Sequence, residues 1–142
     1  MTNEDVLDLV RRCKLRGGVE LSPNEAYLFQ RKFRSNVNGR IYYEQEEVIV
    51  LVKNGIKVGG IYRMGPYDIH VVIKEEYRGK GILSGFLKKG IINEIWPENT
   101  SVKLCGVDTR EEYNKKRYLV QLCNMTIRNE DEIERHLSIL HQ

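Results

Sequence analysis

The first hydrophobic pattern along the chain is that of an amphipathic helix. Between residues 3 and 15, apolar side chains recur at helical spacing, with Val6 and Val10 four positions apart. Acidic residues occupy the first turn, where they favour a helix N-terminus. Either Thr2 or Asn3 has a suitable side chain for the N-cap. We therefore expect a helix over residues 3–15.

A second helix is expected between Ser22 and about Arg34. The stretch Ser22-Pro23-Asn24-Glu25 has a serine at the cap position, a proline at the first helical position and a glutamate at the third. This order is typical of a helix start. The predicted helix buries Ala26, Leu28, Phe29 and Phe33. Residues 36–39 are expected to form the turn that follows it.

Strand patterns begin near residue 41. Residues 41–43 are a short candidate strand, and residues 48–52 (VIVLV) and 56–62 are apolar runs rich in β-branched side chains. Asn54-Gly55 lies between the two runs, and this dipeptide is the strongest short-range signal for a type I′ hairpin. Residues 69–73 (IHVVI) give a further strong strand. The pattern therefore predicts three consecutive antiparallel strands.

Helix and strand patterns alternate in the second half of the chain. After the stretch YRGKG, apolar residues spaced by four predict one long helix from Ile82 to Ile95, which Trp96-Pro97 ends. The remaining expected elements are a strand at 102–107, a helix at 110–123, a strand at 125–127 and a helix at 130–140. The fold class predicted is α/β (α+β), a mixed, mainly antiparallel central sheet flanked by helices, in a single domain over residues 1–142.

Composition is that of an ordinary globular domain. The chain has 142 residues, of which 41% are hydrophobic and 30% charged. No apolar run approaches the roughly 20 residues that cross a bilayer, and the acidic N-terminal stretch does not resemble a targeting signal. The three cysteines, Cys13, Cys105 and Cys123, show no metal-binding spacing. We expect a cytoplasmic protein with no metal and no membrane association.

The net charge of +3 leaves two interpretations of the cationic clusters open. Stretches such as RRCKLR, RKFR and NKKR are distributed along the chain. They are either solvated surface or attract a polyanion or a phosphate-bearing cofactor.

The stretch YRGKGILSG at residues 77–85 is the most informative motif. Its glycines follow a strand pattern and precede a helix pattern, which is where phosphate-binding loops occur. The P-loop spacing G-x-x-x-x-G-K-[ST] is absent from the sequence. The dinucleotide fingerprint G-x-G-x-x-G fails by one place, because Ser84 stands where the third glycine is required and Gly85 follows it.

Residues 78–83, RGKGIL, resemble the R/Q-x-x-G-x-G/A signature of the GNAT superfamily of N-acetyltransferases. The similarity extends over about residues 48–123, although Leu83 stands where the family has glycine or alanine. The resemblance implies that the loop amides bind the pyrophosphate of acetyl-CoA, and that the pantetheine arm pairs with the preceding strand. It assigns cofactor binding to Val71, Val72, Ile73, Arg78, Gly79, Lys80, Gly81, Ile82, Leu83 and Ser84.

The resemblance also implies catalytic candidates for direct acetyl transfer to an amine. An acid must protonate the departing thiolate, and a base must take a proton from the amine. Tyr118 is closest to the tyrosine that serves as the acid in the family, with Tyr113 as second choice. His70 and Tyr67 are the candidates for the base. Carboxylates that reach the cleft through water are the alternative: Asp68, Glu44, Glu46 and Glu47.

The acceptor and the activity itself stay open at this point. The acceptor amine is a small molecule, a peptide or an amine carried by tRNA, and a homodimer is possible. Five tyrosines expected on the surface are candidates to line its pocket: Tyr27, Tyr42, Tyr43, Tyr62 and Tyr67. The alternative function is a non-catalytic GNAT-like module that binds CoA, protein or nucleic acid.

Overall fold

The computed structural model describes residues 2–64, 68–95, 103–104, 111 and 114–115. The chain divides into two compact units, residues 1–80 and 81–142, which are described separately. The first unit contains α1 (Asn3–Arg12), the 3-10 helix η1 (Leu15–Gly17), β1 (Val19–Ser22), β2 (Ala26–Val37), β3 (Arg40–Lys53), β4 (Ile56–Met64), β5 (Asp68–Ile73) and the 3-10 helix η2 (Glu75–Tyr77). The second contains α2 (Ile82–Lys88), α3 (Ile91–Ile95) and β6 (Lys103–Leu104).

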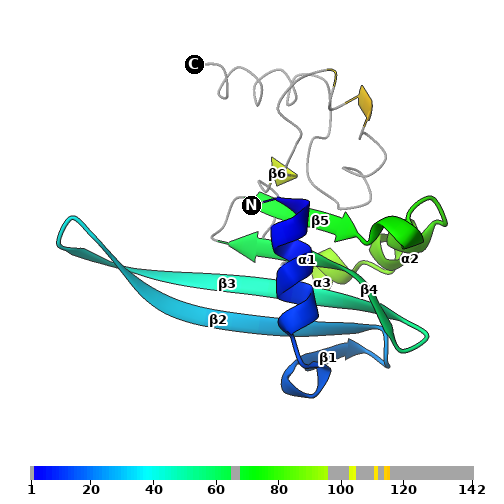
Figure 1. The fold of residues 1–142 in the computed structure, drawn as a ribbon, viewed down its shortest axis with the longest axis horizontal. Coiled ribbons are helices and arrows are strands. Elements are labelled where there is room, and N and C mark those ends of the chain that lie inside the picture. The colour runs from blue at the N-terminus through cyan, green and yellow to red at the C-terminus, as the bar shows by residue number, and fades with distance from the viewer. Residues whose placement is uncertain (1, 65–67, 96–102, 105–110, 112–113, 116–142) are drawn as a thin grey trace. The chain divides into compact units, whose positions relative to one another are not determined.

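The first unit is an α+β structure built on an open antiparallel sheet (Figure 1). Strands β1 to β5 lie side by side in sequence order. Asn54 (φ 52°) and Gly55 (φ 78°) join β3 to β4 with both residues in the left-handed region, as a type I′ turn requires. The three predicted antiparallel strands are therefore confirmed as parts of β3, β4 and β5.

The predicted second helix is wrong, because its residues form the β1–β2 turn and β2. Asn24 has φ 61°, and its backbone N–H donates to Glu20 Oε1 at 2.6 Å, which closes a turn where the helix was expected to begin. Asn38-Gly39 forms a second turn with both φ angles positive and sets β2 against β3 from Ala26 to Val37. A ladder of this length outweighs a local helix-start signal.

Helix α1 packs on one face of this sheet, with Thr2 as its N-cap. The Thr2 hydroxyl accepts from the backbone N–H of Asp5 at 3.2 Å, and the Asp5 carboxylate accepts from the Thr2 N–H at 2.9 Å. Val6 and Val10 are fully buried against the valines of β3 and against β4 and β5. Gly60 permits this contact, because a Cβ there would lie 2.4 Å from Val10 Cγ2. We call this side the helix face of the sheet.

The opposite face of β3 and β4 is equally apolar. Side chains alternate along a strand, so Val48 and Val50 point to the helix face while Ile49 and Leu51 point away from it. Ile49, Leu51, Ile61 and Ile69 are all 0% exposed. Burial on both faces accounts for the unbroken apolar run VIVLV.

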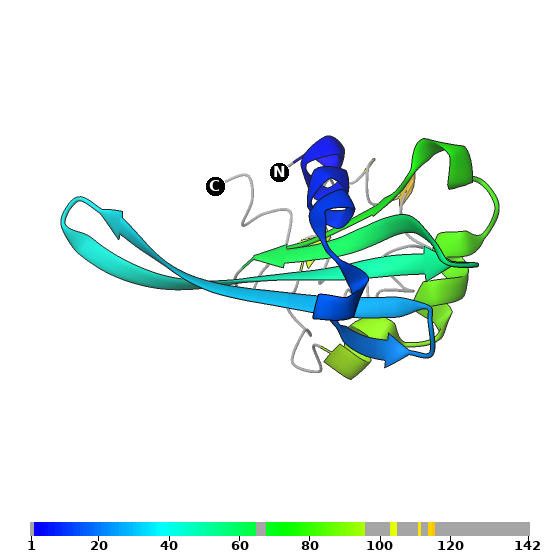
Figure 2. The same cartoon turned by 60° about the horizontal axis from the view of Figure 1, so that its bottom comes forward.

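Strands β2 and β3 continue beyond the sheet as a two-stranded arm, which we define as residues 31–45. Strand β3 pairs with β4 only as far as Glu46, which lies opposite Met64. Among the described residues, Arg40 to Gln45 pair with β2 alone. Figures 1 and 2 show this hairpin extending away from α1 and from β4 and β5.

The predicted long helix of the second unit is interrupted. Gly90 adopts φ 76° between α2 and α3, because Lys89 and Gly90 close the last turn of α2 by hydrogen bonds to Phe86 and Leu87. The predicted strand 102–107 is described only at Lys103–Leu104. The expected strand at 125–127 and helix at 130–140 lie outside the described residues, as does most of the expected helix at 110–123. No helix within the described residues is long and apolar enough to span a membrane.

Candidate functional site

The glycine-rich loop follows β5 through the short helix η2. Arg78 donates from Nε to the carbonyl oxygen of Ile73 at 2.8 Å and so ties the loop to the end of β5. Gly79 has φ 75° and Gly81 has φ 72°, and a Cβ added at either would meet no atom within 4 Å. The two glycines are therefore required by the backbone conformation and not by close packing.

The loop presents cations and backbone donors. Lys80 Nζ lies 5.9 Å from the ring centroid of Tyr77, and Arg78, Gly79, Lys80 and Gly81 are all exposed. Gly81 is the N-cap of α2 and has no side chain to accept from the helix amides. The N–H of Gly85 bonds to the Gly81 carbonyl at 3.0 Å, so the amides of residues 82–84 precede the first α-helical hydrogen bond of α2.

Residues 71–73, which are predicted to pair with the pantetheine arm, lie in β5. One edge of β5 is paired with β4. Val71, Val72 and Ile73 lie opposite Ile61, Gly60 and Gly59 in the antiparallel register. Val72 and Ile73 are buried and Val71 is half-buried. Alternation places His70 and Val72 on the helix face and Val71 and Ile73 on the other.

Of Tyr118, His70 and Tyr67, the described residues include His70 alone. Its Nε2 lies 2.6 Å from Oδ1 of Asn3 at the start of α1. The structure therefore places the imidazole beside the N-terminus of α1. Tyr67 and Tyr118 lie outside the described residues.

A row of polar side chains crosses the helix face from β5 to β2. His70 lies opposite Tyr62 in the β4–β5 register. The Tyr62 hydroxyl donates to Glu46 Oε2 at 2.9 Å, and Arg31 lies 3.2 Å from Glu46 Oε1. Tyr62 is only 4% exposed, so the expectation that it lies on the surface is wrong. Burial, and then the Glu46 carboxylate, raise the pKa of Tyr62, so the phenol stays protonated as a donor.

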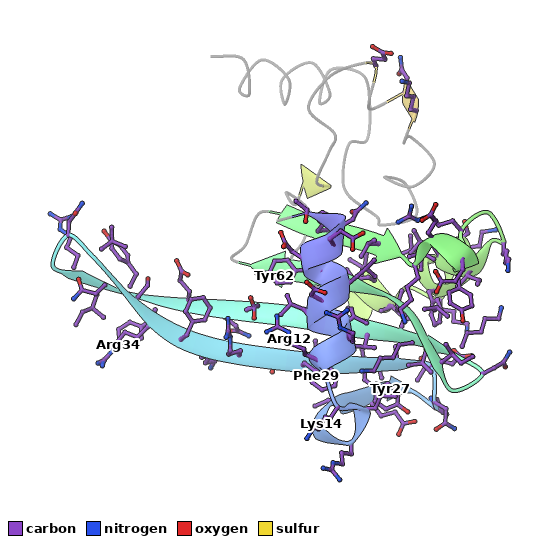
Figure 3. All side chains as sticks on the ribbon, in the orientation of Figure 1. Arg12, Lys14, Tyr27, Phe29, Arg34 and Tyr62 are labelled. Carbon is purple, nitrogen blue, oxygen red and sulfur yellow. The ribbon has the colours of Figure 1, made fainter. Side chains whose placement is uncertain are left out.

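Glu46 also lines a pocket between α1 and the start of the arm. The pocket has a volume of about 220 Å³ and is lined by Leu9, Arg12, Cys13, Phe29, Arg31 and Glu46 among others. Figure 3 labels Arg12 and Phe29 beside α1. Burial raises the pKa of the Cys13 thiol, which disfavours the nucleophilic thiolate. The lining combines apolar side chains with the charged groups of Arg12, Arg31 and Glu46, and the raised thiol pKa argues against covalent catalysis by Cys13.

No match to this chain was found among models of known protein families, curated proteins or solved structures. Within the described residues, no group of three or more His, Cys, Asp and Glu side chains is arranged to hold a metal ion. The function is therefore argued from the loop and from the polar row.

Proposed function

We propose that the chain is an acetyl-CoA-dependent N-acyltransferase of GNAT type. The observation that carries the proposal is the left-handed conformation of Gly79 and Gly81 on either side of Lys80, in the loop between β5 and α2. Alternating left-handed residues turn neighbouring amides toward one side and create a concave site for an anion. The motif order of the resemblance, a meander of strands followed by this loop and a helix, supports the same function.

In this proposal the loop amides bind the pyrophosphate of acetyl-CoA, and Arg78 and Lys80 add positive charge. The pantetheine arm follows β5 at residues 71–73. The acceptor nitrogen attacks the thioester carbonyl directly, forming the N–C bond as the C–S bond breaks. The amine proton passes to a base, and the CoA thiolate takes a proton from an acid.

The polar row offers two bases for that step. His70 is one of them, and its Nε2 is engaged with Asn3. Glu46, one of the carboxylates considered from the sequence, lines the pocket and is close to Arg31. A small amine that also carries a negative charge fits this pocket, with the amine at Glu46 and the anionic group at Arg12 or Arg31. Glu46 is the base we favour.

The contacts of both candidate bases favour the second candidate function. Asn3 engages His70, and Tyr62 and Arg31 engage the two oxygens of Glu46. If these contacts are only structural, the domain binds CoA without turning it over. A panel of amines tested for thiol release in the presence of acetyl-CoA separates the two functions. Release on at least one amine, lost in Glu46→Gln with the affinity for acetyl-CoA unchanged, supports the enzyme. Affinity without release on any amine supports the module.

Calorimetry with acetyl-CoA tests the loop assignment itself. Gly81→Glu places a side chain and a negative charge at the proposed pyrophosphate site, so the dissociation constant should rise on the order of 100-fold through two lost charge-assisted hydrogen bonds. Gly55→Glu is the matched control, because Gly55 has φ 78° and equally open surroundings in the β3–β4 turn. Equal affinities for both variants would remove the assignment, as would the absence of acetyl-CoA binding in the unmodified protein.

A further inference from the structure

The arm formed by residues 31–45 exposes several large apolar and aromatic side chains. Val37 is 53% exposed, Ile41 54% and Tyr43 82%. No described residue of another element pairs with the arm beyond Glu46. An exposed arm of this kind indicates a surface for a partner.

The two faces of the arm differ in charge. Over its whole length the arm has four cationic side chains (Arg31, Lys32, Arg34, Arg40) and one carboxylate (Glu44). Strand alternation places Glu44 on the same side as Arg31, Phe33, Arg40 and Tyr42, so a carboxylate accompanies the two cations of that side. The other side, which we call the cationic face, consists of Lys32, Arg34, Asn36, Ile41, Tyr43 and Gln45, and it carries no carboxylate.

The cationic face combines charge with an aromatic ring. Lys32 and Arg34 are two positions apart on β2, about 7 Å along the strand. Tyr43 lies directly opposite Arg34 on β3, so ring and guanidinium are neighbours on one surface. A hollow follows the arm here, lined by Lys32, Arg34, Tyr43 and Gln45 and also by Phe33 and Glu44, which belong to the other face. Figure 3 shows Arg34 on the arm, well away from α1.

We propose that the cationic face of the arm binds single-stranded nucleic acid. Lys32 and Arg34 neutralise backbone phosphates, and a base stacks on the ring of Tyr43. Asn36 and Gln45 supply amide groups for the sugar or base edges at either end of the face. A second copy of the chain is a poorer partner, since its arm carries the same excess of positive charge.

A duplex is also a poorer partner for this face. The bases of a duplex are paired and stacked on one another, so none is free to stack on the ring of Tyr43. The second face of this arm holds Glu44, which repels phosphates, and Glu46 follows it at the body of the sheet. The nucleic acid therefore lies along one face, which suits a single strand with unstacked bases.

Fluorescence anisotropy with a labelled oligonucleotide of about 12 nucleotides tests the proposal. We expect single-stranded RNA or DNA to bind more tightly than the duplex of the same sequence, with affinity falling between about 50 and about 200 mM salt. Lys32→Glu combined with Arg34→Glu should reduce the slope of log K against log salt by about 1.4, which corresponds to two phosphate contacts. Lys14→Glu combined with Lys53→Glu makes the same charge change at exposed positions outside the arm and should retain that slope.

Two neighbouring tyrosines provide the sharpest comparison. Tyr43→Ala should weaken binding roughly 5- to 100-fold through the loss of stacking. Tyr42→Ala removes the same ring from the other face and should leave the affinity within about twofold. Equal losses for the two variants overturn the proposal, and so does duplex binding as tight as single-strand binding, or no binding at about 50 mM salt. Because both side chains are exposed, unchanged thermal unfolding of the variants confirms that the fold is intact.

Discussion

Strands β2 and β3 form one continuous ladder whose two ends have opposite environments. At the arm end Tyr43 is 82% exposed, while at the body end Ile49 and Val50 are 0% exposed. The backbone pairing is the same throughout, so the difference lies in the side chains, RIYYEQEE in one part and VIVLV in the other. Because an isolated two-stranded hairpin is marginally stable, the body must fix the conformation of the arm. The body end of the ladder therefore provides stability, and the arm end provides accessible surface.

The largest difference in unfolding free energy between body and arm variants should come from adding a side chain within the body. A Cβ at Gly59 would lie 2.3 Å from the carbonyl oxygen of Val72 and 2.9 Å from the Cα of Ile73, and neither backbone atom can move cheaply. Gly59→Val should therefore cost more than about 4 kcal/mol of unfolding free energy. Asn36→Val places the same valine on the exposed arm, in exchange for a side chain of similar size, and should change stability by less than about 0.5 kcal/mol. Chemical denaturation of both variants measures the difference.

Truncating an isoleucine to alanine should give the next largest difference in stability between body and arm. Ile61 is 0% exposed at the centre of β4, so Ile61→Ala should cost about 2 to 5 kcal/mol through lost transfer energy and a residual cavity. Ile41→Ala makes the same change on the arm, where the isoleucine is 54% exposed, and should cost less than about 0.5 kcal/mol. Urea unfolding midpoints for the pair measure this. Equal losses would mean that the arm is part of the core.

A single hydroxyl should give a smaller contrast. Tyr62→Phe removes the donor to Glu46 and leaves a partly buried carboxylate with one partner fewer, so we expect a loss of about 1 kcal/mol. Tyr42→Phe on the exposed arm should be close to neutral. Thermal unfolding of both variants is the measurement, and an equal shift in Tm would show that the Glu46 contact adds nothing to stability.

The smallest effect on stability should come from protonation of Asp5 at low pH, at the exposed start of α1. Hydrogen bonds from the Thr2 backbone and then from the Thr2 side chain lower the pKa of Asp5. A depressed folded-state pKa stabilises the protein above the unfolded value of about 3.9, and this contribution is lost as the pH falls through the folded pKa. Asp5→Asn should therefore flatten the decline of Tm between about pH 5 and about pH 2. An unaltered pH profile would contradict this role of Asp5.

Much of the fold could be predicted from local signals. Asn54-Gly55 located the β3–β4 hairpin, and the run IHVVI located β5, because both patterns depend on neighbours in the sequence. The segment after Ser22 could not be placed this way. Its start resembles a helix cap, yet the side chains Tyr27 and Phe29, two positions apart, pack against the cluster beneath α1. Pairing with β3 makes this segment a strand, and that pairing is a tertiary interaction which local sequence signals do not report.

The site was partly predictable for a related reason. The glycines at 79 and 81 were identified from spacing, and their positive φ angles agree with the need for glycine there. The contact between Tyr62 and Glu46 was not predictable. A two-residue turn at Asn54-Gly55 without irregularity pairs Tyr62 with Glu47. The bulge at Val58 shifts the register by one, so that Tyr62 lies opposite Val48 and reaches Glu46 diagonally.

Lys57 has a consequence for the order in which the nascent chain takes shape. Its ammonium group donates to the carbonyls of Val10 and Arg11 at 3.0 and 3.2 Å and also to that of Cys13, at the end of α1. These contacts span up to 47 residues of sequence. The ribosome therefore releases α1 well before the lysine that fixes its last turn, and before the strands that cover Val6 and Val10. The helix that is synthesised first is therefore secured only after β4 and β5 have been synthesised.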